Sequence, residues 1–315
     1  MVKFGKTATE KQRWRCMSCA TTGIRARPDI ATLHRVQRFA HWLTTTTSAT
    51  TKARAAGITV RGLHKQFRLC WNIEPHPPRW TVPATVVVLD GTSLLPRQCV
   101  ALIAYGLGDA PQISWSFAPR ESSATWSALL AHIPPARFVV CDGQKGLLSA
   151  LKRHWPNTTI QRCLIHVVRQ SIAWITQRPQ TRAGQELLVL VRGLSKVWTR
   201  RQKRKWLHRF WNWWRRRERF LNARTGHPHD PKRWWYTHRK LRRVRTLIER
   251  SLPHLFTYVR HPEVPRTSNH VEGGINARLH ELFRAHRGIS VSRKRVLTAY
   301  FLLSKLKKKS TRKFH

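Results

Sequence analysis

The stretch 84–162 alternates short β-rich runs with helical runs, and this order constrains the fold more than any other feature of the chain. Runs of β-branched residues predict strands, and apolar residues at helical spacing predict helices. We expect strands at 85–89, 98–105, 112–117, 137–141 and 158–162, and helices at 122–132 and 144–154. Three strands, a helix, a strand, a helix and a strand indicate an α/β domain with a mixed sheet.

Two of the predicted strands lead into an aspartate. Asp90 follows the apolar run 86–89, Asp142 follows 138–141, and a glycine comes after each aspartate. One interpretation is a pair of Asp-Gly hairpin turns. The other is two strand ends that bring both carboxylates to one sheet edge, where they would repel unless a divalent cation lay between them. The helical run 144–154 favours the second interpretation for Asp142, since a hairpin requires another strand.

A third acid, Glu272, lies at the start of a helical pattern that runs towards residue 286. Asn269 and Glu272 have the spacing of a helix-capping box, which is the simpler interpretation. The glycines Gly273 and Gly274 argue for a functional one, because glycine costs about 1 kcal/mol relative to alanine inside a helix. They would allow the close approach of a backbone or a metal ion.

The charge of the chain indicates its kind of partner. Its 315 residues hold 60 Lys and Arg against 14 Asp and Glu, a formal net charge of +46. Such an excess repels itself in a compact state, so a polyanion such as nucleic acid is the expected partner. On charge alone an RNA-coating protein stays open as an alternative. The hydrophobic fraction of 41% argues against wholesale disorder.

Helical patterns flank the α/β stretch. A helix-turn-helix is expected within 31–73, interrupted at 44–51, with Leu33 on its apolar face and the basic residues Arg61, His64, Lys65 and Arg68 on its second helix. Four prolines make 74–83 a linker. In 167–262 no strand pattern is visible, and Trp206, Phe210, Trp213 and Trp214 recur at helical spacing among many Lys and Arg residues. The end, 304–315, is expected to be a mobile basic tail.

Specific motifs resemble those of bacterial insertion-sequence transposases of the mutator-like superfamily, which are DDE transposases. They are LDGT at 89–92, CDG at 141–143, RCLIH at 162–166, TSNHVEGGIN at 267–276 and HRG at 286–288. The resemblance implies a ribonuclease H-like mixed-sheet catalytic core that is interrupted by an all-helical insertion. A small helix-turn-helix region and a partial zinc ribbon would precede this core.

The resemblance also implies roles for individual residues. Asp90, Asp142 and Glu272 would be catalytic and would hold two Mg²⁺ ions, for which Mn²⁺ can substitute. Cys163 and His166 match the family's C-x2-H motif and would support the active site, although a buried thiol and a core histidine are the alternative. The residues expected to contact DNA are Arg61, Lys65, Arg68, His270 and Arg287.

The first residues resemble the second half of a zinc ribbon. Cys16 and Cys19 form one C-x2-C pair, whereas a four-cysteine Zn²⁺ site needs two. The missing first pair leads us to expect that the chain starts late relative to the family, through a misplaced start codon or decay of the element. Zn²⁺ binding is therefore left open.

These predictions divide the chain into segments and define its function. The segments are 1–30 (partial zinc ribbon), 31–73 (helix-turn-helix), 74–83 (linker), 84–166 (first part of the core), 167–262 (helical insertion), 263–303 (last part of the core, with Glu272) and 304–315 (tail). The expected function is a transposase that cuts the ends of an insertion sequence and joins them to target DNA. Its partners would be the terminal inverted repeats, target DNA and further copies of the chain.

Two rival functions stay open: a DNA-binding protein without activity, such as a decayed transposase, and a ribonuclease H-like junction nuclease. No apolar run has the 18 or so residues of a membrane span, and no apolar block follows the charged start. We therefore expect no membrane partner, reduced cysteines, and a cytoplasmic location at the nucleoid.

Overall fold

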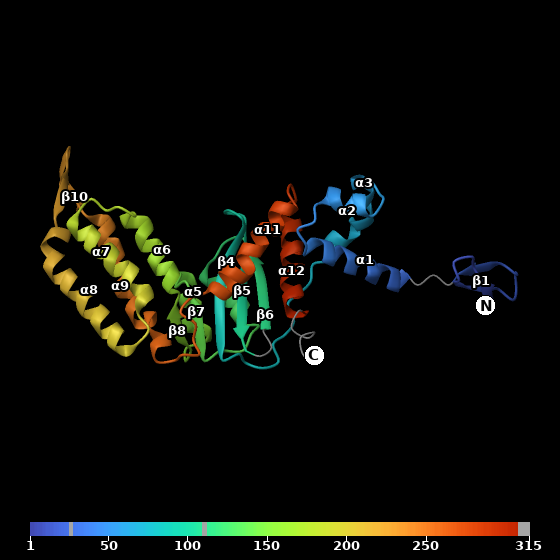
Figure 1. Cartoon of the computed structure of the whole chain (residues 1–315), viewed down its shortest axis with the longest axis horizontal. Helices are drawn as coiled ribbons and strands as arrows, with labels where there is room; N and C mark the ends of the chain where they lie inside the picture. The colour runs from blue at the N-terminus through green and yellow to red at the C-terminus, as the bar shows by residue number, and fades with distance from the viewer. Residues whose placement is uncertain (25–27, 109–111, 308–315) are drawn as a thin grey trace. The chain divides into compact units, whose positions relative to one another are not determined.

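The computed structural model describes residues 1–24, 28–108 and 112–307, and the chain divides into two compact units, 1–74 and 75–315. Figure 1 shows the elements of both units. Among the described residues, no helix is long and apolar enough to cross a membrane.

The first unit begins with a small antiparallel sheet and continues with helices. Its elements are β1 (Val2–Lys6), β2 (Gln12–Arg15), β3 (Thr22–Ile24), α1 (Pro28–Leu43), α2 (Ala49–Ala55), α3 (Val60–Phe67) and the 3-10 turn η1 (Leu69–Asn72). Phe39 packs against Phe67 and Trp71, with ring centroids 5.4 and 4.9 Å apart. Aromatic side chains thus form the core of this helical cluster.

Two expectations for the first unit are wrong. The interruption predicted at 44–51 is shorter, because the Ser48 side chain accepts a hydrogen bond from the Thr51 backbone and caps α2 from inside that stretch. Leu33 was expected on the apolar face of the first helix, but it is 55% exposed. The buried face of α1 is formed by Phe39, Trp42 and Leu43 instead.

The second unit contains a five-stranded mixed sheet with strand order β6-β5-β4-β7-β8. Its elements are β4 (Val86–Leu95), β5 (Cys99–Leu107), β6 (Gln112–Ala118), α4 (Ser123–Leu130), β7 (Phe138–Cys141), α5 (Lys145–His154) and β8 (Thr159–Arg162). β4 is antiparallel to β5 and parallel to β7, and β7 is parallel to β8. The predicted order of strands and helices is confirmed, and the fold class is mixed α/β.

Both faces of the sheet are covered. Val87 and Leu89 of β4 pack with Trp126 of α4 and Leu151 of α5 in one core. Neighbouring residues of a strand point to opposite faces, so Val88 and Asp90 face the other side. On that side lie α10 (Asn269–Val271), the π-helical turn η4 (Glu272–Asn276), α11 (Ala277–Ala285) and α12 (Val291–Lys307). The predicted tail at 304–315 is wrong for 304–307, which continue α12, and 308–315 lie outside the described residues.

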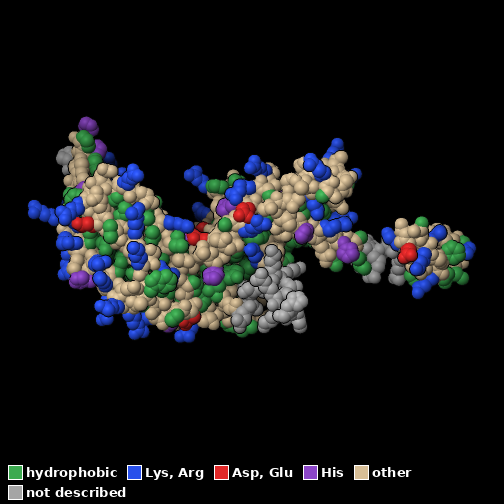
Figure 2. Space-filling model, viewed as in Figure 1, with side chains coloured by type: hydrophobic (Ala, Val, Ile, Leu, Met, Phe, Trp, Pro, Cys, Tyr) green, Lys and Arg blue, Asp and Glu red, His purple; other side chains and the backbone are tan. Residues whose placement is uncertain are grey.

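A helical region connects β8 to these last helices. It comprises α6 (Leu164–Ile175), α7 (Arg182–Gly193), η2 (Leu194–Lys196), α8 (Arg200–Leu221), β9 (Arg224–His227), β10 (Asp230–Tyr236), α9 (Arg239–Leu255) and η3 (Thr257–Val259). Trp206, Phe210 and Trp213 of α8 are buried in its core, as their spacing predicts. In the view of Figure 2, Lys and Arg side chains are spread over its surface and outnumber the acidic ones.

The expectation of an all-helical insertion is wrong, because β9 and β10 form an antiparallel hairpin. β10 contains Trp234, Trp235 and Tyr236, and aromatic residues favour β structure. The guanidinium group of Arg224 lies 3.9 Å from the ring centroid of Trp234, and that of Arg242 lies 3.6 Å from the ring centroid of Tyr236. These cation–π contacts stabilise the hairpin without the apolar alternation that marks a strand in sequence.

Candidate active site

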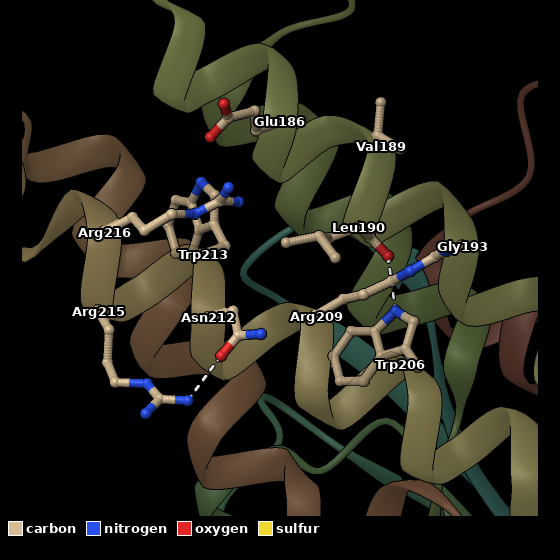
Figure 3. A pocket seen from close by; sticks show the side chains of 10 residues that line it. All are labelled: Glu186, Val189, Leu190, Gly193, Trp206, Arg209, Asn212, Trp213, Arg215 and Arg216. Carbon is tan, nitrogen blue, oxygen red and sulfur yellow. Dashed lines mark hydrogen bonds between the residues drawn. The ribbon is translucent and has the colours of Figure 1, made fainter.

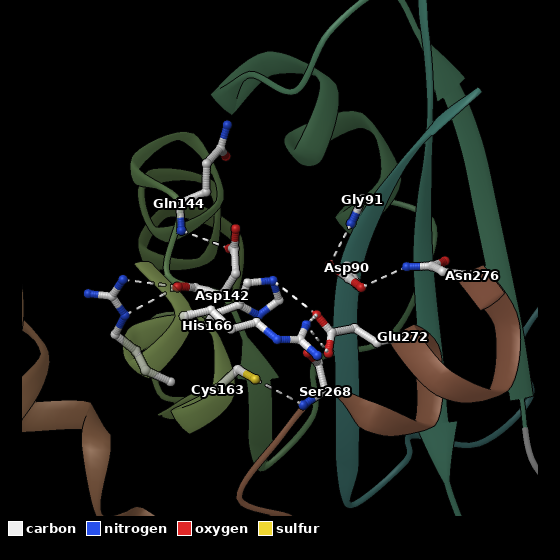
Figure 4. Close-up of polar contacts among 11 residues, drawn as sticks. Asp90, Gly91, Asp142, Gln144, Cys163, His166, Ser268, Glu272 and Asn276 are labelled. Atoms are coloured by element: carbon white, nitrogen blue, oxygen red, sulfur yellow. Dashed lines mark hydrogen bonds and ion pairs between the residues drawn. The ribbon is translucent and has the colours of Figure 1, made fainter. Parts of the chain in front are cut away.

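The sheet brings the two predicted aspartates to the same level. Val86, Val87 and Val88 of β4 pair in parallel with Phe138, Val139 and Val140 of β7. The same register places Asp90 level with Asp142, which directly follows β7. Both carboxylates therefore come from neighbouring parallel strands (Figure 4).

Neither aspartate lies in a hairpin turn, so that interpretation is wrong for both. Asp90 is inside β4, where it pairs with Ile103 of β5, and the strand continues to Leu95. The expectation that Asp90 ends its strand is therefore wrong too. Backbone hydrogen bonds to β5 extend β4 past the apolar run 86–89. The sequence pattern of β4 alone does not reveal this pairing. Asp142 leads into α5, as predicted.

Asp90 is buried and hydrogen-bonded. The residue is 8% exposed. Its carboxylate accepts one hydrogen bond from the Gly91 backbone and one from Asn276 Nδ2, each of 3.1 Å. The pKa of Asp90 is raised to about 7, chiefly by burial and also by the charges of Asp142 and Glu272, against the effect of His166. Ionisation of this carboxyl group is therefore disfavoured without a nearby cation.

Asp142 is held through both its side chain and its backbone. Its Oδ1 accepts a hydrogen bond of 2.8 Å from the Gln144 backbone, and its carbonyl oxygen accepts one of 2.9 Å from Arg162 Nη2. Gly143 has φ +78°, and a Cβ there would lie 2.1 Å from Arg162 Nε. Only glycine allows the Arg162 guanidinium group to lie against this turn.

Glu272 faces α6. Its Oε1 lies 3.2 Å from His166 Nε2 and 3.3 Å from Arg169 Nη1, while its side chain is 17% exposed. The capping-box interpretation is wrong, because Asn269 already lies within α10 and Glu272 begins the π-helical turn η4. A π turn inserts an extra residue into a helix and is common at functional sites.

Cys163 and His166 adjoin this contact. Cys163 precedes α6, is fully buried, and its Sγ accepts a bond of 3.3 Å from the Ser268 backbone. The pKa of His166 is raised to about 9, first by its interaction with the Cys163 side chain and further by Glu272 and Asp90, against the effect of burial. A charged His166 strengthens the ion pair with Glu272. The interpretation of His166 as a core histidine does not fit this contact.

The chemistry of these residues fits Mg²⁺, which prefers carboxylate oxygens. The raised pKa of Asp90 fits as well, because a cation between the carboxylates would relieve their repulsion. Across residues 1–24, 28–108 and 112–307, no three His, Cys, Asp or Glu side chains converge as a metal site. The Glu272 carboxylate is held against α6 by its contacts with His166 and Arg169.

Other residues at the site have weak or no signals in the sequence. Glu121, just before α4, lies so close to Gly91 that a Cβ there would be 2.3 Å from Glu121 Oε1. The pKa of Glu121 is raised, first by burial and then by Asp142. Arg169 could have been found, because it is three residues beyond His166 on one helix. Asn276 belongs to the TSNHVEGGIN motif, which could have identified it.

The residues predicted to contact DNA are exposed. Arg61 and Lys65 lie exposed on α3, and Arg68 directly follows it. His270 is exposed and stacks on Tyr105 with ring centroids 6.3 Å apart, and Arg287 is exposed after α11. Cys16 and Cys19 are in the turn between β2 and β3. Hydrogen bonding, first with Ser18 and then with Cys19, lowers the pKa of Cys16 to about 6.

The fold and site together define an α/β protein with acidic residues on neighbouring strands. Residues 85–227 match the family model described as transposase, Mutator family. This stretch of the chain is therefore similar to transposases of that family.

Two transposases of insertion sequence elements are similar to part of the chain. A probable transposase for an insertion sequence element of Corynebacterium diphtheriae is 28% identical over 98 residues, covering 29% of this chain and 28% of that protein. A transposase for insertion sequence element IS905 of Lactococcus lactis is 35% identical over 99 residues, covering 27% and 25%. The chain thus matches about a quarter of the length of these relatives.

A solved structure also matches in part. It is a simian T-cell lymphotropic virus intasome in complex with the PP2A regulatory subunit B56 gamma, with 11% identity and a TM-score of 0.21. The match covers 49% of this chain and 66% of that one. A score this low carries no argument about the fold.

Proposed function

We propose that the chain is a DNA transposase that cuts the ends of an insertion sequence and joins them to target DNA. The observation that carries this function is the placement of Asp90 level with Asp142 on parallel strands, beneath the turn that bears Glu272. The antiparallel β6-β5-β4 strands followed by parallel β7 and β8 support a ribonuclease H-like core.

In this proposal Asp90, Asp142 and Glu272 hold two Mg²⁺ ions, or Mn²⁺ in their place. Bound there, the metal would activate the attacking oxygen and stabilise the leaving oxygen. Asn276 and the Gly91 backbone orient the Asp90 carboxylate through their hydrogen bonds. His166 and Arg169 hold Glu272 near the sheet until it joins the aspartates.

The proposed reaction has two phosphoryl transfers. A water molecule first attacks a phosphodiester at the end of the element, and the bond to the 3′ oxygen breaks. The freed 3′-hydroxyl then attacks a phosphodiester of the target strand in line with its leaving oxygen. Arg162 and Gln144 keep the Asp142 turn in one position during both steps.

The first unit is proposed to contact DNA. The helix pair α2 and α3 supports a helix-turn-helix in which Arg61, Lys65 and Arg68 reach the phosphates. His270 and Arg287 would contact phosphates near the core. Cys16 and Cys19 would supply two of the four ligands of a Zn²⁺ site, the other two coming from elsewhere.

The protein would act at the nucleoid in the cytoplasm, as a homo-oligomer on paired element ends.

The test is cleavage of DNA that carries the flanks of the reading frame, with Mg²⁺ or Mn²⁺. We expect metal-dependent cuts at the element ends by the wild type and none by Asp142→Asn or Glu272→Gln, which preserve side-chain size. Binding without any cut would favour a DNA-binding protein that has lost activity. Cuts at four-way junctions irrespective of end sequence would favour a junction nuclease.

A further inference from the structure

A cationic pocket of about 670 Å³ lies between the Asp142 turn and α9. Its basic lining residues come from α5, the end of β8 and α9 (Figure 1), and they are Lys145, Arg162, Arg239, Arg242, Arg243 and Arg250. Among the described residues that line it, none is acidic. Six cations therefore surround one cavity without an anion.

The scarce acids of the chain pair with arginines elsewhere. Glu186 accepts two hydrogen bonds, of 2.9 and 2.6 Å, from Arg217, and Glu249 forms an ion pair with Arg245 at 2.6 Å. The larger cavity between α7 and α8, about 870 Å³, has Glu186 in its lining (Figure 3). The cationic pocket differs from it because its charges have no such neutralisation, and clustered like charges favour an anionic ligand.

Several of these cations are available for a ligand. Within the described part of the chain, Lys145, Arg239 and Arg250 form no ion pair, and all three are exposed. Arg239, Arg243 and Arg250 follow at spacings of four and seven residues, so they share one face of α9. They span about 16 Å along the helix axis, the axial length of about five phosphates of one strand in duplex DNA.

The walls of the pocket suit a nucleic-acid strand. Trp174 and Tyr236 line it together with Leu148 and Leu247. Arg243 lies 4.5 Å from the ring centroid of Trp174, so a planar cation already covers that aromatic face. A ligand would meet guanidinium groups backed by aromatic rings, an arrangement that holds phosphate oxygens and tolerates any base.

The pocket adjoins the candidate active site. Gly143, the residue after Asp142, lines it, and Arg162 reaches from the pocket to the Asp142 carbonyl oxygen. A strand whose scissile phosphate lies at Asp142 would therefore continue directly into the pocket. Resting on the proposed function, we infer that this pocket binds the phosphodiester backbone of the DNA strand next to the scissile phosphate.

The test measures DNA binding without cleavage, by fluorescence anisotropy of the full chain in EDTA. Labelled element ends are used with and without five extra nucleotides beyond the cut, on the 5′ or the 3′ side. In the wild type, the extension on one side should tighten binding about tenfold. The double variant Arg239→Ala/Arg250→Ala should lose this gain in affinity. The slope of its log binding constant against log salt concentration should be smaller in magnitude by about 1.5 than that of the wild type.

A matched control removes the same charge elsewhere in the helical region. Arg216→Ala/Arg219→Ala changes two exposed arginines of α8 and should keep the gain from the extension. Arg239→Lys/Arg250→Lys should keep most of it, which excludes misfolding as the cause of the loss. Equal losses in both alanine pairs would overturn the inference, since affinity would then follow total charge alone.

Two further outcomes separate the possible failures. If tripolyphosphate protects the wild type but not Arg239→Ala/Arg250→Ala from thermal unfolding, while both bind DNA equally, the pocket binds a small anion and the inference is wrong. If the alanine pair binds extended DNA like the wild type while the wild type cuts element ends, only the inference fails. If the wild type never cuts but the extension effect depends on Arg239 and Arg250, the proposed function fails and strand binding stands.

Discussion

Asn276 Nδ2 donates a hydrogen bond of 3.1 Å to Asp90 Oδ2, although the two residues are 186 positions apart. The bond connects the π-helical turn after Glu272 to the central strand of the sheet. Asn276 Oδ1 is buried and has no hydrogen-bond partner among the described residues. The turn therefore bears the Glu272 carboxylate and also holds the Asp90 carboxylate through the amide nitrogen of Asn276 (Figure 4).

Asn276→Ala should weaken Mn²⁺ binding by about tenfold, because residues that orient metal ligands typically contribute 10- to 100-fold to affinity. Mn²⁺ electron paramagnetic resonance in the absence of DNA measures the effect. Asn212→Ala, on α8 outside the sheet, is the control and should leave the affinity unchanged. Unchanged Mn²⁺ affinity in Asn276→Ala would show that its bond to Asp90 has no part in metal binding.

The raised pKa of Asp90 predicts a pH-dependent effect on stability. A carboxyl group whose pKa rises from 3.8 to about 7 on folding stabilises the fold below about pH 4, and this contribution is lost as the pH rises through 7. Asp90→Asn keeps the shape and removes the charge. In metal-free buffer the variant should melt at a higher temperature than the wild type at pH 8, with no such gain at pH 4.

Calorimetric melting at both pH values, with EDTA present, checks this prediction. Asp230→Asn is the control, because Asp230 lies in the β9–β10 hairpin and not in the five-stranded sheet. Mn²⁺ should reverse the order at pH 8 by stabilising the wild type alone. A variant that is less stable than the wild type at pH 8 without metal would contradict the raised pKa.

Local pattern is sufficient to predict most elements of the α/β domain but not the contacts between them. The strands β5, β6, β7 and β8 follow from runs of β-forming residues. Asp90 was placed at a strand end because the run of valines stops there, whereas pairing with β5 carries β4 on to Leu95. The β9–β10 hairpin was missed because cation–π contacts, rather than alternating apolar residues, stabilise it.

In the candidate site too, the sequence identifies some residues, whereas others are found only through tertiary contacts. Asp90, Asp142 and Glu272 were identified from their sequence motifs, and their catalytic role stays a prediction. Glu121 was missed because its proximity to Gly91 arises only when α4 packs on the sheet. The pairing of Glu272 with Arg169 joins residues 103 positions apart, and only tertiary structure brings them together.

Gly91→Ala should destabilise the fold slightly, because the new Cβ would lie 2.3 Å from Glu121 Oε1 and the half-buried carboxylate would have to move. Since the carboxylate is the end of a flexible side chain, we expect a cost near the low end of the about 1–3 kcal/mol that overpacking causes. Urea unfolding measures it, and Gly274→Ala is the control, with nothing within 4 Å of the added Cβ. If Glu121→Ala fails to suppress the effect in the double variant, the contact with Glu121 is not its cause.

Cys163→Ala should lower the pKa of His166 from about 9 towards its ordinary value of 6.5, because the interaction with the Cys163 side chain is the largest cause of the increase. A raised histidine pKa stabilises the fold fully below about pH 6.5, and this contribution is lost as the pH rises through 9. In the variant, the free energy of unfolding should lose this pH-dependent contribution. The loss of packing at Cys163 should lower it by the same amount at every pH. Titration of the His166 ring by NMR measures the pKa directly. An unchanged His166 titration in the variant would mean that Glu272 and Asp90 alone keep His166 charged.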